Sequence, residues 1–143
     1  MTIIPRAEPE TTPEGIPNVD KRAPLTFSVE IRPEDAMKLE YIHTLNTLAD
    51  DSGIIIAFTL PTMTSLPFMR VYTPVDVLFV NEQGIILQML PNTILGEIFQ
   101  DIMAKEPIKA FVFLKAGTIE RKSIKPRDRI DNPIFIPPPA IIE

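Results

Sequence analysis

The sequence predicts a small, mainly β (α+β) fold: a β-sandwich or a partly open barrel of short strands, with two covering helices. Short apolar runs separated by turn residues follow one another without a regular alternation of helices, which argues against a doubly wound fold. Two of these runs flank Asn81-Glu82-Gln83-Gly84, a four-residue turn with a late glycine that is typical of a hairpin. Five prolines fall in residues 1–24 and four in the last 11 residues, where they disfavour helices and central strands.

These prolines also set the expected domain boundaries. A length of 143 residues suits a single domain. We expect residues 1–24 to form a disordered, proline-rich arm, residues 25–130 to form one globular domain, and residues 131–143 to form a proline-rich tail.

The first half of the domain predicts a strand, a helix and a second strand. Leu25–Ile31 alternates apolar and polar residues, as a half-buried strand does. Pro33 and two acidic residues after it suit a helix start, and apolar residues recur at helical spacing until Asp50–Gly53 ends the segment with turn residues. The continuous apolar run Ile54–Leu60 predicts a strand buried on both faces.

The second half predicts a hairpin, another helix and two more strands. After a proline-broken segment that allows only a short or edge strand, Val75–Val80 and Ile85–Leu90 form the hairpin. Asn92 is a plausible N-cap for a helix whose apolar stripe continues to Met103. For the rest of the domain we expect a strand over Ile108–Leu114, one helical turn over Thr118–Ile124, and a last strand that begins within Arg127–Ile130.

Composition excludes several function classes. The net charge is −5 and the basic residues form no stripe, which argues against nucleic acid and against anionic membranes as partners. No apolar run approaches the roughly 20 residues of a membrane span, and residues 1–10 do not resemble a signal peptide. The chain has no cysteine, a single histidine (His43) and no phosphate-binding or dinucleotide motif, so we predict no metal and no cofactor.

Asp76 is the most informative candidate for a site, because it shares a strand face with apolar residues. A buried carboxylate needs a partner, and it is either a site acid or a structural acid that accepts backbone N–H bonds; we favour the structural interpretation. Arg70, Tyr72 and Thr73 precede the same strand and are candidates to line a pocket with it, or to form a solvated edge. Asp128, between two arginines, is a further candidate and invites a local ion pair.

Several segments resemble a known prokaryotic family, the domain of unknown function 192 family. The resemblance covers residues 25–130, and its segments are Leu48–Ile56, Pro74–Val80, Ala116-Gly117-Thr118 and Asp128. It implies a compact, mainly β fold and, in many members, export to the cell envelope. This chain departs from the family's polar signature, since the family's Lys-Asn-Thr trio falls on Met69, Arg70 and Val71. Asp76 matches the family pattern, whereas most of the polar signature is replaced.

The functional expectation is therefore a non-catalytic β domain that binds a small ligand or a protein, with export to the periplasm suggested by the resemblance. The proline-rich ends are candidates for contacts with a protein partner or a second copy. One alternative is an acid-assisted hydrolase that uses Asp76, with Arg70 stabilising an anion. The other alternative is a purely structural or accessory domain.

Overall fold

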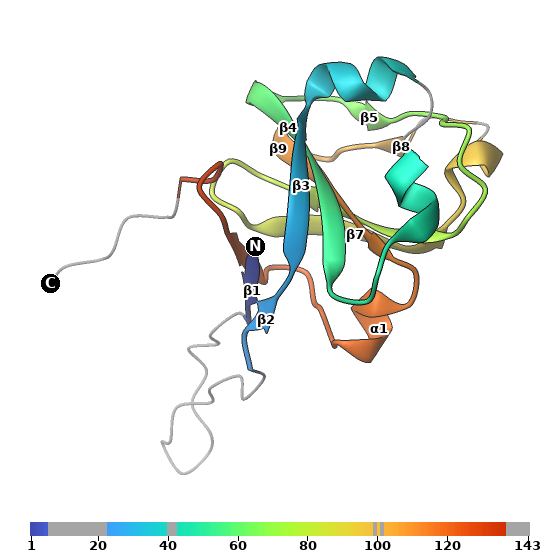
Figure 1. The fold of residues 1–143 in the computed structure, drawn as a ribbon. Helices are drawn as coiled ribbons and strands as arrows, with labels where there is room; N and C mark the ends of the chain where they lie inside the picture. The colour runs from blue at the N-terminus through green and yellow to red at the C-terminus, as the bar shows by residue number, and fades with distance from the viewer. Residues whose placement is uncertain (6–22, 40–42, 99, 101, 137–143) are drawn as a thin grey trace, which may run out of the picture.

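A five-stranded sheet forms the centre of the protein in the computed structural model (Figure 1), which describes residues 1–5, 23–39, 43–98, 100 and 102–136. Its strands β3 and β4 are parallel, and the other neighbours are antiparallel. The spatial order is β3 (Ser28–Pro33), β4 (Ser52–Thr62), β9 (Ile108–Lys115), β6 (Val75–Val80) and β7 (Ile86–Thr93).

Two smaller sheets accompany the central one. The first has the order β10 (Arg129–Asp131), β1 (Thr2–Ile4) and β2 (Leu25–Thr26), and all of its pairs are antiparallel. The second pairs β5 (Ser65–Leu66) with β8 (Ile102–Met103). The chain passes from the first small sheet to the central sheet at Phe27, between β2 and β3.

The helical segments of the described chain are short. Three are 3-10 helices, and the fourth is a single turn of α-helix; they are η1 (Glu34–Leu39), η2 (His43–Thr47), η3 (Leu95–Glu97) and α1 (Thr118–Arg121). Segments η1 and η2 belong to the crossover that joins the parallel strands β3 and β4, since a parallel pair requires a long connection.

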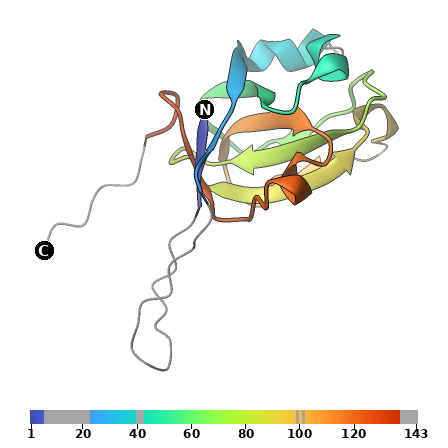
Figure 2. The ribbon, with the colours of Figure 1, turned by 60° about the horizontal axis from the view of Figure 1, so that its bottom comes forward.

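The central sheet is buried on both faces, which accounts for its continuous apolar runs. On one face Phe79, Phe111 and Phe113 pack with residues of the loops around β5 and η3. On the other face Leu78 and Val112 pack in one cluster with residues of the first small sheet and of α1. Figure 2 turns the ribbon so that this side, where β1, β2 and α1 lie in Figure 1, comes forward. Phe111 contacts Phe79 edge-to-face, with 4.9 Å between ring centroids, and such pairs stabilise a core beyond their buried area.

The mainly β prediction is confirmed, and the hairpin and the strand over 108–114 form as expected. Gly84 has φ +85, the left-handed conformation that the turn requires. The described strands form no closed barrel, and the prediction of two covering helices is wrong.

The first predicted helix is replaced by η1 and η2, with residues 40–42 outside the described part. Pro33 ends β3 instead of opening a helix. Thr44, Asn46 and Thr47 are weak helix formers, because β-branched and short polar side chains favour other conformations.

The second predicted helix, over 92–103, is also wrong. Asn92 is not an N-cap: it has φ +49 and lies in β7, opposite Asp76. Among the described residues of this range, only Leu95–Glu97 are helical, and Ile98 is already extended, with φ −83 and ψ +106; residues 99 and 101 lie outside the described part. Leu95, Ile98 and Ile102 still pack against the core. The apolar stripe therefore predicted the burial of these residues correctly, but it predicted the wrong backbone conformation.

The ends differ from the predicted arm and tail where they are described. Thr2–Ile4 form β1 and Ile3 is 1% exposed, so the start of the predicted arm is part of the fold. At the other end, Asp131 belongs to β10 and Phe135 is buried. Residues 6–22 and 137–143 lie outside the described residues, so for them the arm and the tail stay predictions.

Candidate functional site

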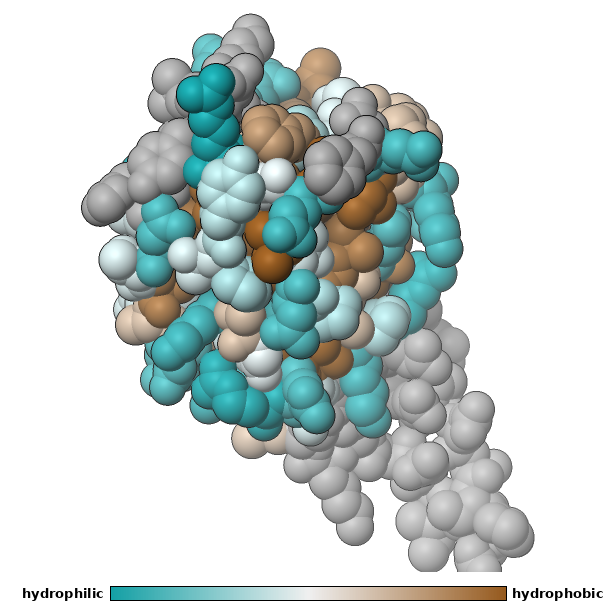
Figure 3. Space-filling view, turned by 90° about the vertical axis from the view of Figure 1, so that its right-hand side faces the viewer, coloured by the Kyte–Doolittle hydropathy of each residue, from teal (hydrophilic) through white to brown (hydrophobic). Residues whose placement is uncertain are grey.

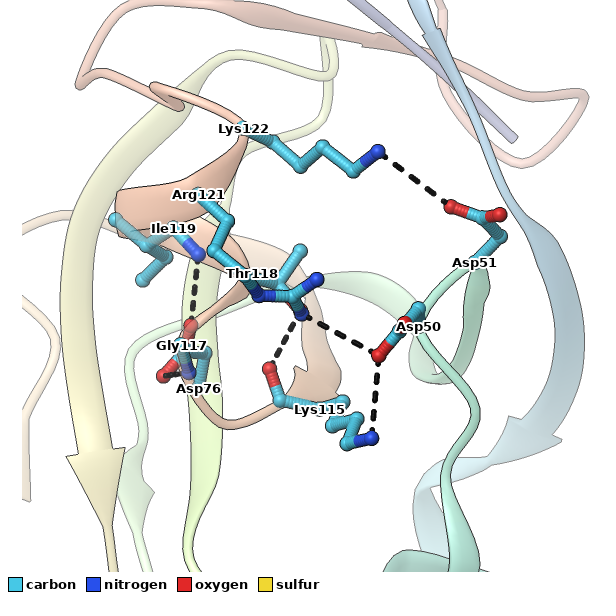
Figure 4. Close-up of polar contacts among 9 residues, drawn as sticks. All are labelled: Asp50, Asp51, Asp76, Lys115, Gly117, Thr118, Ile119, Arg121 and Lys122. Atoms are coloured by element: carbon cyan, nitrogen blue, oxygen red, sulfur yellow. Dashed lines mark hydrogen bonds and ion pairs between the residues drawn. The ribbon is translucent and has the colours of Figure 1, made fainter.

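The carboxylate of Asp76 is completely buried and accepts three backbone hydrogen bonds. Its Oδ1 accepts from the N–H of Asn92 at 2.8 Å. Oδ1 also accepts from the N–H of Gly117 at 3.3 Å, and Oδ2 accepts from the N–H of Ile119 at 2.8 Å (both in Figure 4). We call these four residues the Asp76 corner. The arrangement favours the structural interpretation of Asp76, since backbone donors satisfy both carboxylate oxygens.

The Asp76 corner has a clear local cause in a bulge of β7. Val75 pairs with Thr93 and Val77 with Leu90, so Pro91 and Asn92 together oppose Asp76. Pro91 has no N–H, and the N–H of Asn92 turns to the Asp76 carboxylate instead of a strand carbonyl. The acid therefore repairs the break in the ladder that the bulge creates.

The other two donors are Gly117, in the turn after β9, and Ile119, in α1. Gly117 has φ +89, which directs the chain into α1 and brings two N–H groups of the turn toward Asp76. Thr118 is also buried, and its hydroxyl donates to the Lys115 carbonyl at 2.6 Å. A single carboxylate thus holds three strands and a helix start in register.

A charged cluster covers this turn on the solvent side (Figure 4). Asp50, after η2, lies 3.1 Å from Lys115 Nζ and 3.6 Å from an Arg121 nitrogen, and Asp51 lies 3.8 Å from Lys122 Nζ. The hydrogen bond from Lys115, followed by the charges of Lys115 and Arg121, lowers the pKa of the Asp50 carboxyl below its usual 3.8. These side chains are about half exposed, so the cluster aligns the η2–β4 turn with α1 but stabilises it little.

Asp128 is buried rather than on the surface. It is 1% exposed, and its Oδ2 accepts the N–H of Lys125 at 2.9 Å, which closes a turn ahead of β10. Its own carbonyl accepts the N–H of Ile86 at 2.9 Å, and the turn is thereby fastened to β7. The expectation of a local ion pair with its arginine neighbours did not include this backbone role.

The three candidates that precede β6 do not join Asp76 in one site. Arg70 is exposed, and Tyr72 is 61% exposed and packs over Gly96, where an added Cβ would lie 2.4 Å from its ring. Thr73 is exposed and donates to the amide oxygen of Asn46 at 2.9 Å. The structure therefore places these residues at the surface and Asp76 beneath it.

Thr73 lines a small pocket of about 180 Å³ between η2 and the end of β9. We call this the Thr73 pocket; its lining residues are Leu45, Asn46, Leu48, Thr73, Pro74, Lys115 and Ala116. Asp76 is not among them. The pocket is smaller than most ligand pockets, which occupy roughly 300–1,000 Å³.

A larger groove of about 340 Å³ lies on the other side of Leu48, between η2 and the first residues of β3 and β4. We call it the β3–η2 groove. Its lining residues are Ser28, Val29, Glu30, Thr44, Thr47, Leu48, Ala49, Ser52, Gly53 and Ile54.

The lining of the β3–η2 groove is rich in hydroxyls and poor in charge. Two serines and two threonines contribute hydroxyls, and aliphatic residues provide the apolar surface; none of the described lining residues is Lys, Arg or His. Glu30 is the charged residue among the described lining residues, and it accepts a hydrogen bond from Arg32 at 3.1 Å. Such a surface suits an uncharged ligand with several hydrogen-bonding groups better than a phosphate or a carboxylate.

Thr44 gives this groove an unusual feature. Its Oγ1 is closed to solvent and has no hydrogen-bond partner within the described residues. A buried hydroxyl without a partner destabilises a protein by roughly 1–3 kcal/mol. Thr44 lines the groove with other atoms, so its side chain must rotate before this hydroxyl can bond a ligand.

This groove was not predicted from the sequence. Its hydroxyls come from three separate segments that meet only through the β3–β4 pairing and the position of η2. A weak signal was present: Thr44, Thr47 and Leu48 have the spacing of one helical face. Within the described residues, no three or more acidic or histidine side chains gather as metal ligands, and no helix has the length and apolarity of a membrane span.

The comparisons with known proteins agree with the fold. The model of DUF192, described as an uncharacterized ACR, matches residues 17–132. No curated protein matches the sequence. One similar crystal structure, from Sinorhizobium meliloti 1021, is provisionally described as a transcription regulator; it is 23% identical with a TM-score of 0.64, over 90% of this chain and 88% of that chain.

A second similar crystal structure is a protein of unknown function from Novosphingobium aromaticivorans DSM 12444. It is 22% identical with a TM-score of 0.67, over 86% of this chain and 91% of that chain. At these identities the two structures show the fold alone. The family model covers most of the chain and confirms the resemblance seen in the sequence, and the chain therefore belongs to the DUF192 family.

Proposed function

We propose that this protein is a non-catalytic binding domain that takes a small, uncharged, hydrogen-bonding ligand in the β3–η2 groove. The observation that carries the proposal is the groove itself: it has a volume of about 340 Å³, its described lining is rich in hydroxyls and holds no cation, and one lining residue, Thr44, has a buried hydroxyl without a partner within the described residues. Its volume is at the lower end of the range for ligand pockets, which suits a ligand of the size of a monosaccharide.

The Asp76 corner supports binding over catalysis. A general acid or base must reach the substrate directly or through one water molecule. Asp76 is fully buried, its oxygens accept three backbone hydrogen bonds, and it lines neither the groove nor the Thr73 pocket. The hydrolase alternative would require this corner to open, with loss of the contacts that hold β7 and α1.

The exposed apolar residues favour a small ligand over a broad protein interface. The large hydrophobic side chains that are exposed in the described chain are Ile31, Leu60, Met63, Phe68, Tyr72, Met103 and Ile136. On the side that carries η2 and η3, hydrophilic residues interrupt the apolar ones (Figure 3). Scattered exposure of this kind is ordinary, whereas protein interfaces usually present a continuous patch.

The proposal is tested by titration followed by NMR. We would record amide spectra of the 15N-labelled protein with D-glucose, maltose and glycerol, and with glucose 6-phosphate and glucuronate as charged counterparts. We expect shifts confined to residues 28–30, 44–49 and 52–54, with weaker binding of the charged compounds because the described lining residues of the groove include no cation. Shifts elsewhere, or preferred binding of the charged compounds, would contradict the proposal.

Matched variants distinguish the two pockets. Ala49 lines the groove and Ala116 lines the Thr73 pocket, so Ala49→Trp and Ala116→Trp add the same side chain at the two places. Ala49→Trp should abolish the shifts and Ala116→Trp should leave them. The ligand should also be recovered unchanged after incubation, and a product that forms with wild type but not with Asp76→Asn would favour the hydrolase.

Export to the cell envelope is a separate part of the proposal, supported only by the family resemblance. Fractionation of cells that express the natural gene, with an antibody against this chain, tests it. Recovery of the protein in the periplasm would support export. Recovery in the cytoplasm would contradict export and would leave the proposal about the β3–η2 groove unchanged.

A further inference from the structure

The small sheet β10–β1–β2 is completed by a strand from a distant part of the chain. β1 is its central strand: Thr2 pairs with both Asp131 and Thr26, and Ile3 pairs with both Ile130 and Leu25. Beyond the last of these pairs, Phe27 donates its N–H to the Met1 carbonyl at 2.8 Å. Without β1, strands β2 and β10 would have no partner between them in this sheet.

Ile3 fixes β1 in place through its side chain. It is 1% exposed and belongs to the same core cluster as Phe27, Ile130 and Phe135. Thr2 and Ile4 are only partly buried, so Ile3 is the buried apolar side chain of β1, and Met1 just before it packs, partly buried, against the same cluster. The site that receives β1 is thus a slot with two hydrogen-bonding walls and one apolar hole, the arrangement by which proteins bind extended peptides.

The covalent connection of β1 to the rest of the fold is long. Residues 5–24 separate β1 from β2, and a segment of this length spans up to about 60–70 Å when extended. β1 can therefore leave the slot without pulling on β2. The family match begins at residue 17 and ends at 132, so it includes both walls of the slot, β2 and β10, but not β1.

We propose that the slot between β2 and β10 is a strand-binding site, which β1 fills from its own chain and which β1 of a second copy fills by the same contacts. The occupant is identified by its chemistry: an extended Thr-Ile-Ile segment whose central isoleucine enters the apolar hole. A second copy provides this segment, and the exchange is reciprocal, so the assembly closes as a dimer.

The long connection also sets the balance between the two forms. Two segments that belong to one chain meet at an effective concentration on the order of millimolar. The chain's own β1 therefore occupies the slot in dilute solution. Exchange between copies requires a high protein concentration or a temperature at which β1 detaches.

The first experiment frees β1 from the chain without removing it. A protease recognition site is placed between Thr11 and Thr12 of the full chain, the folded protein is cut, and a fluorescent peptide of residues 1–7 is added. We expect the peptide to replace the cut segment and to bind the cut protein at least 100-fold more tightly than the uncut protein. A peptide with Ile3→Asp should not bind, because it would place a carboxylate in the apolar hole.

The second experiment uses uncut protein. Two full-length copies with different fluorescent labels are mixed at millimolar concentration, warmed to just below the melting temperature and cooled. We expect a dimer containing both labels on size-exclusion chromatography, and no such dimer for Ile3→Asp. If the peptide does not bind cut protein from which the β1 segment has been released, the proposal that the slot is a strand-binding site is overturned. If the peptide binds but no dimer forms, the proposal that β1 of a second copy fills the slot is overturned. Neither result bears on the β3–η2 groove.

Discussion

The Asp76 corner and the β3–η2 groove each hide a polar group from water, and they treat it in opposite ways. In the corner, three backbone N–H groups donate to the carboxylate, and both of its oxygens are used. In the groove wall, the Thr44 hydroxyl has no partner within the described residues. A buried polar group with its hydrogen bonds made rigidifies a fold, whereas one without a partner lowers stability and can still form a hydrogen bond. We therefore interpret the Asp76 corner as structural and the β3–η2 groove as a binding site.

The largest expected effect is at Asp76. Asp76→Asn replaces an acceptor oxygen by an NH₂ group that faces backbone donors, and we expect a loss of about 2–4 kcal/mol in the free energy of unfolding. For a chain of this size that corresponds to a fall in melting temperature of roughly 5–15 °C. Denaturant unfolding measures the loss.

Asp51→Asn is the control, because the Asp51 side chain is 75% exposed and its substitution should change stability by less than about 0.5 kcal/mol. If Asp76→Asn were as stable as Asp51→Asn, the corner would not be architectural. The contrast between corner and groove would then fail.

A smaller effect is expected at Gly117, which gives the corner one of its donors. Gly117→Ala must adopt φ +89, and the left-handed conformation costs a residue with a Cβ about 1–2 kcal/mol. The added Cβ itself meets open space, with only Arg121 Nε at 3.8 Å. The measurement is again denaturant unfolding.

Gly84→Ala is the matched comparison, since its φ of +85 is nearly the same but its Cβ would lie 2.3 Å from the Ile130 carbonyl oxygen. It should be clearly more destabilising than Gly117→Ala. Equal losses would mean that conformation alone, and not close packing of the hairpin turn against β10, decides both positions.

In the groove we expect a substitution to raise the free energy of unfolding, whereas the substitutions above lower it. Thr44→Val replaces the unpaired hydroxyl by a methyl group of similar shape, so we expect the ligand-free protein to gain about 1 kcal/mol in stability. The same variant should bind the groove ligand more weakly. Thr47→Val, which alters an exposed hydroxyl of the same groove, should leave the stability of the free protein unchanged.

A loss of stability in Thr44→Val would show that this hydroxyl has a partner in solution. The groove would then resemble the corner, and the proposal would lose its main support. Calorimetric titration of wild type and Thr44→Val with the strongest ligand from the NMR panel completes the test.

The sequence predicted those parts of the molecule whose signal is local. The turn at Gly84, the strand over Ile108–Leu114 and the need of Asp76 for a partner all follow from a few neighbouring residues. The helix expected after Asn92 failed because an apolar spacing of three and four describes burial, and the bulge at Pro91 and Asn92 selects a different backbone. Long-range pairing decided the rest: β1 pairs with β2 and β10, and Ser28, Thr44 and Ser52 meet only in the folded chain.

The smallest expected effect belongs to Asp50, which lies between the two regions, after η2 and against Lys115 and Arg121. Because those cations lower the pKa of its carboxyl in the folded state below 3.8, its ion pairs stabilise the fold above that pH, and the contribution is lost as the pH falls through the lowered pKa. Asp50→Asn should therefore melt slightly below wild type at pH 6, and the two melting temperatures should converge toward pH 2.5. The pairs are exposed, so the difference should also shrink in 1 M NaCl, which screens charges beyond about 3 Å. A difference that persisted at pH 2.5 would mean that the Asp50 side chain orders the η2–β4 turn by hydrogen bonding rather than by charge, and would make that turn a second structural corner beside the groove.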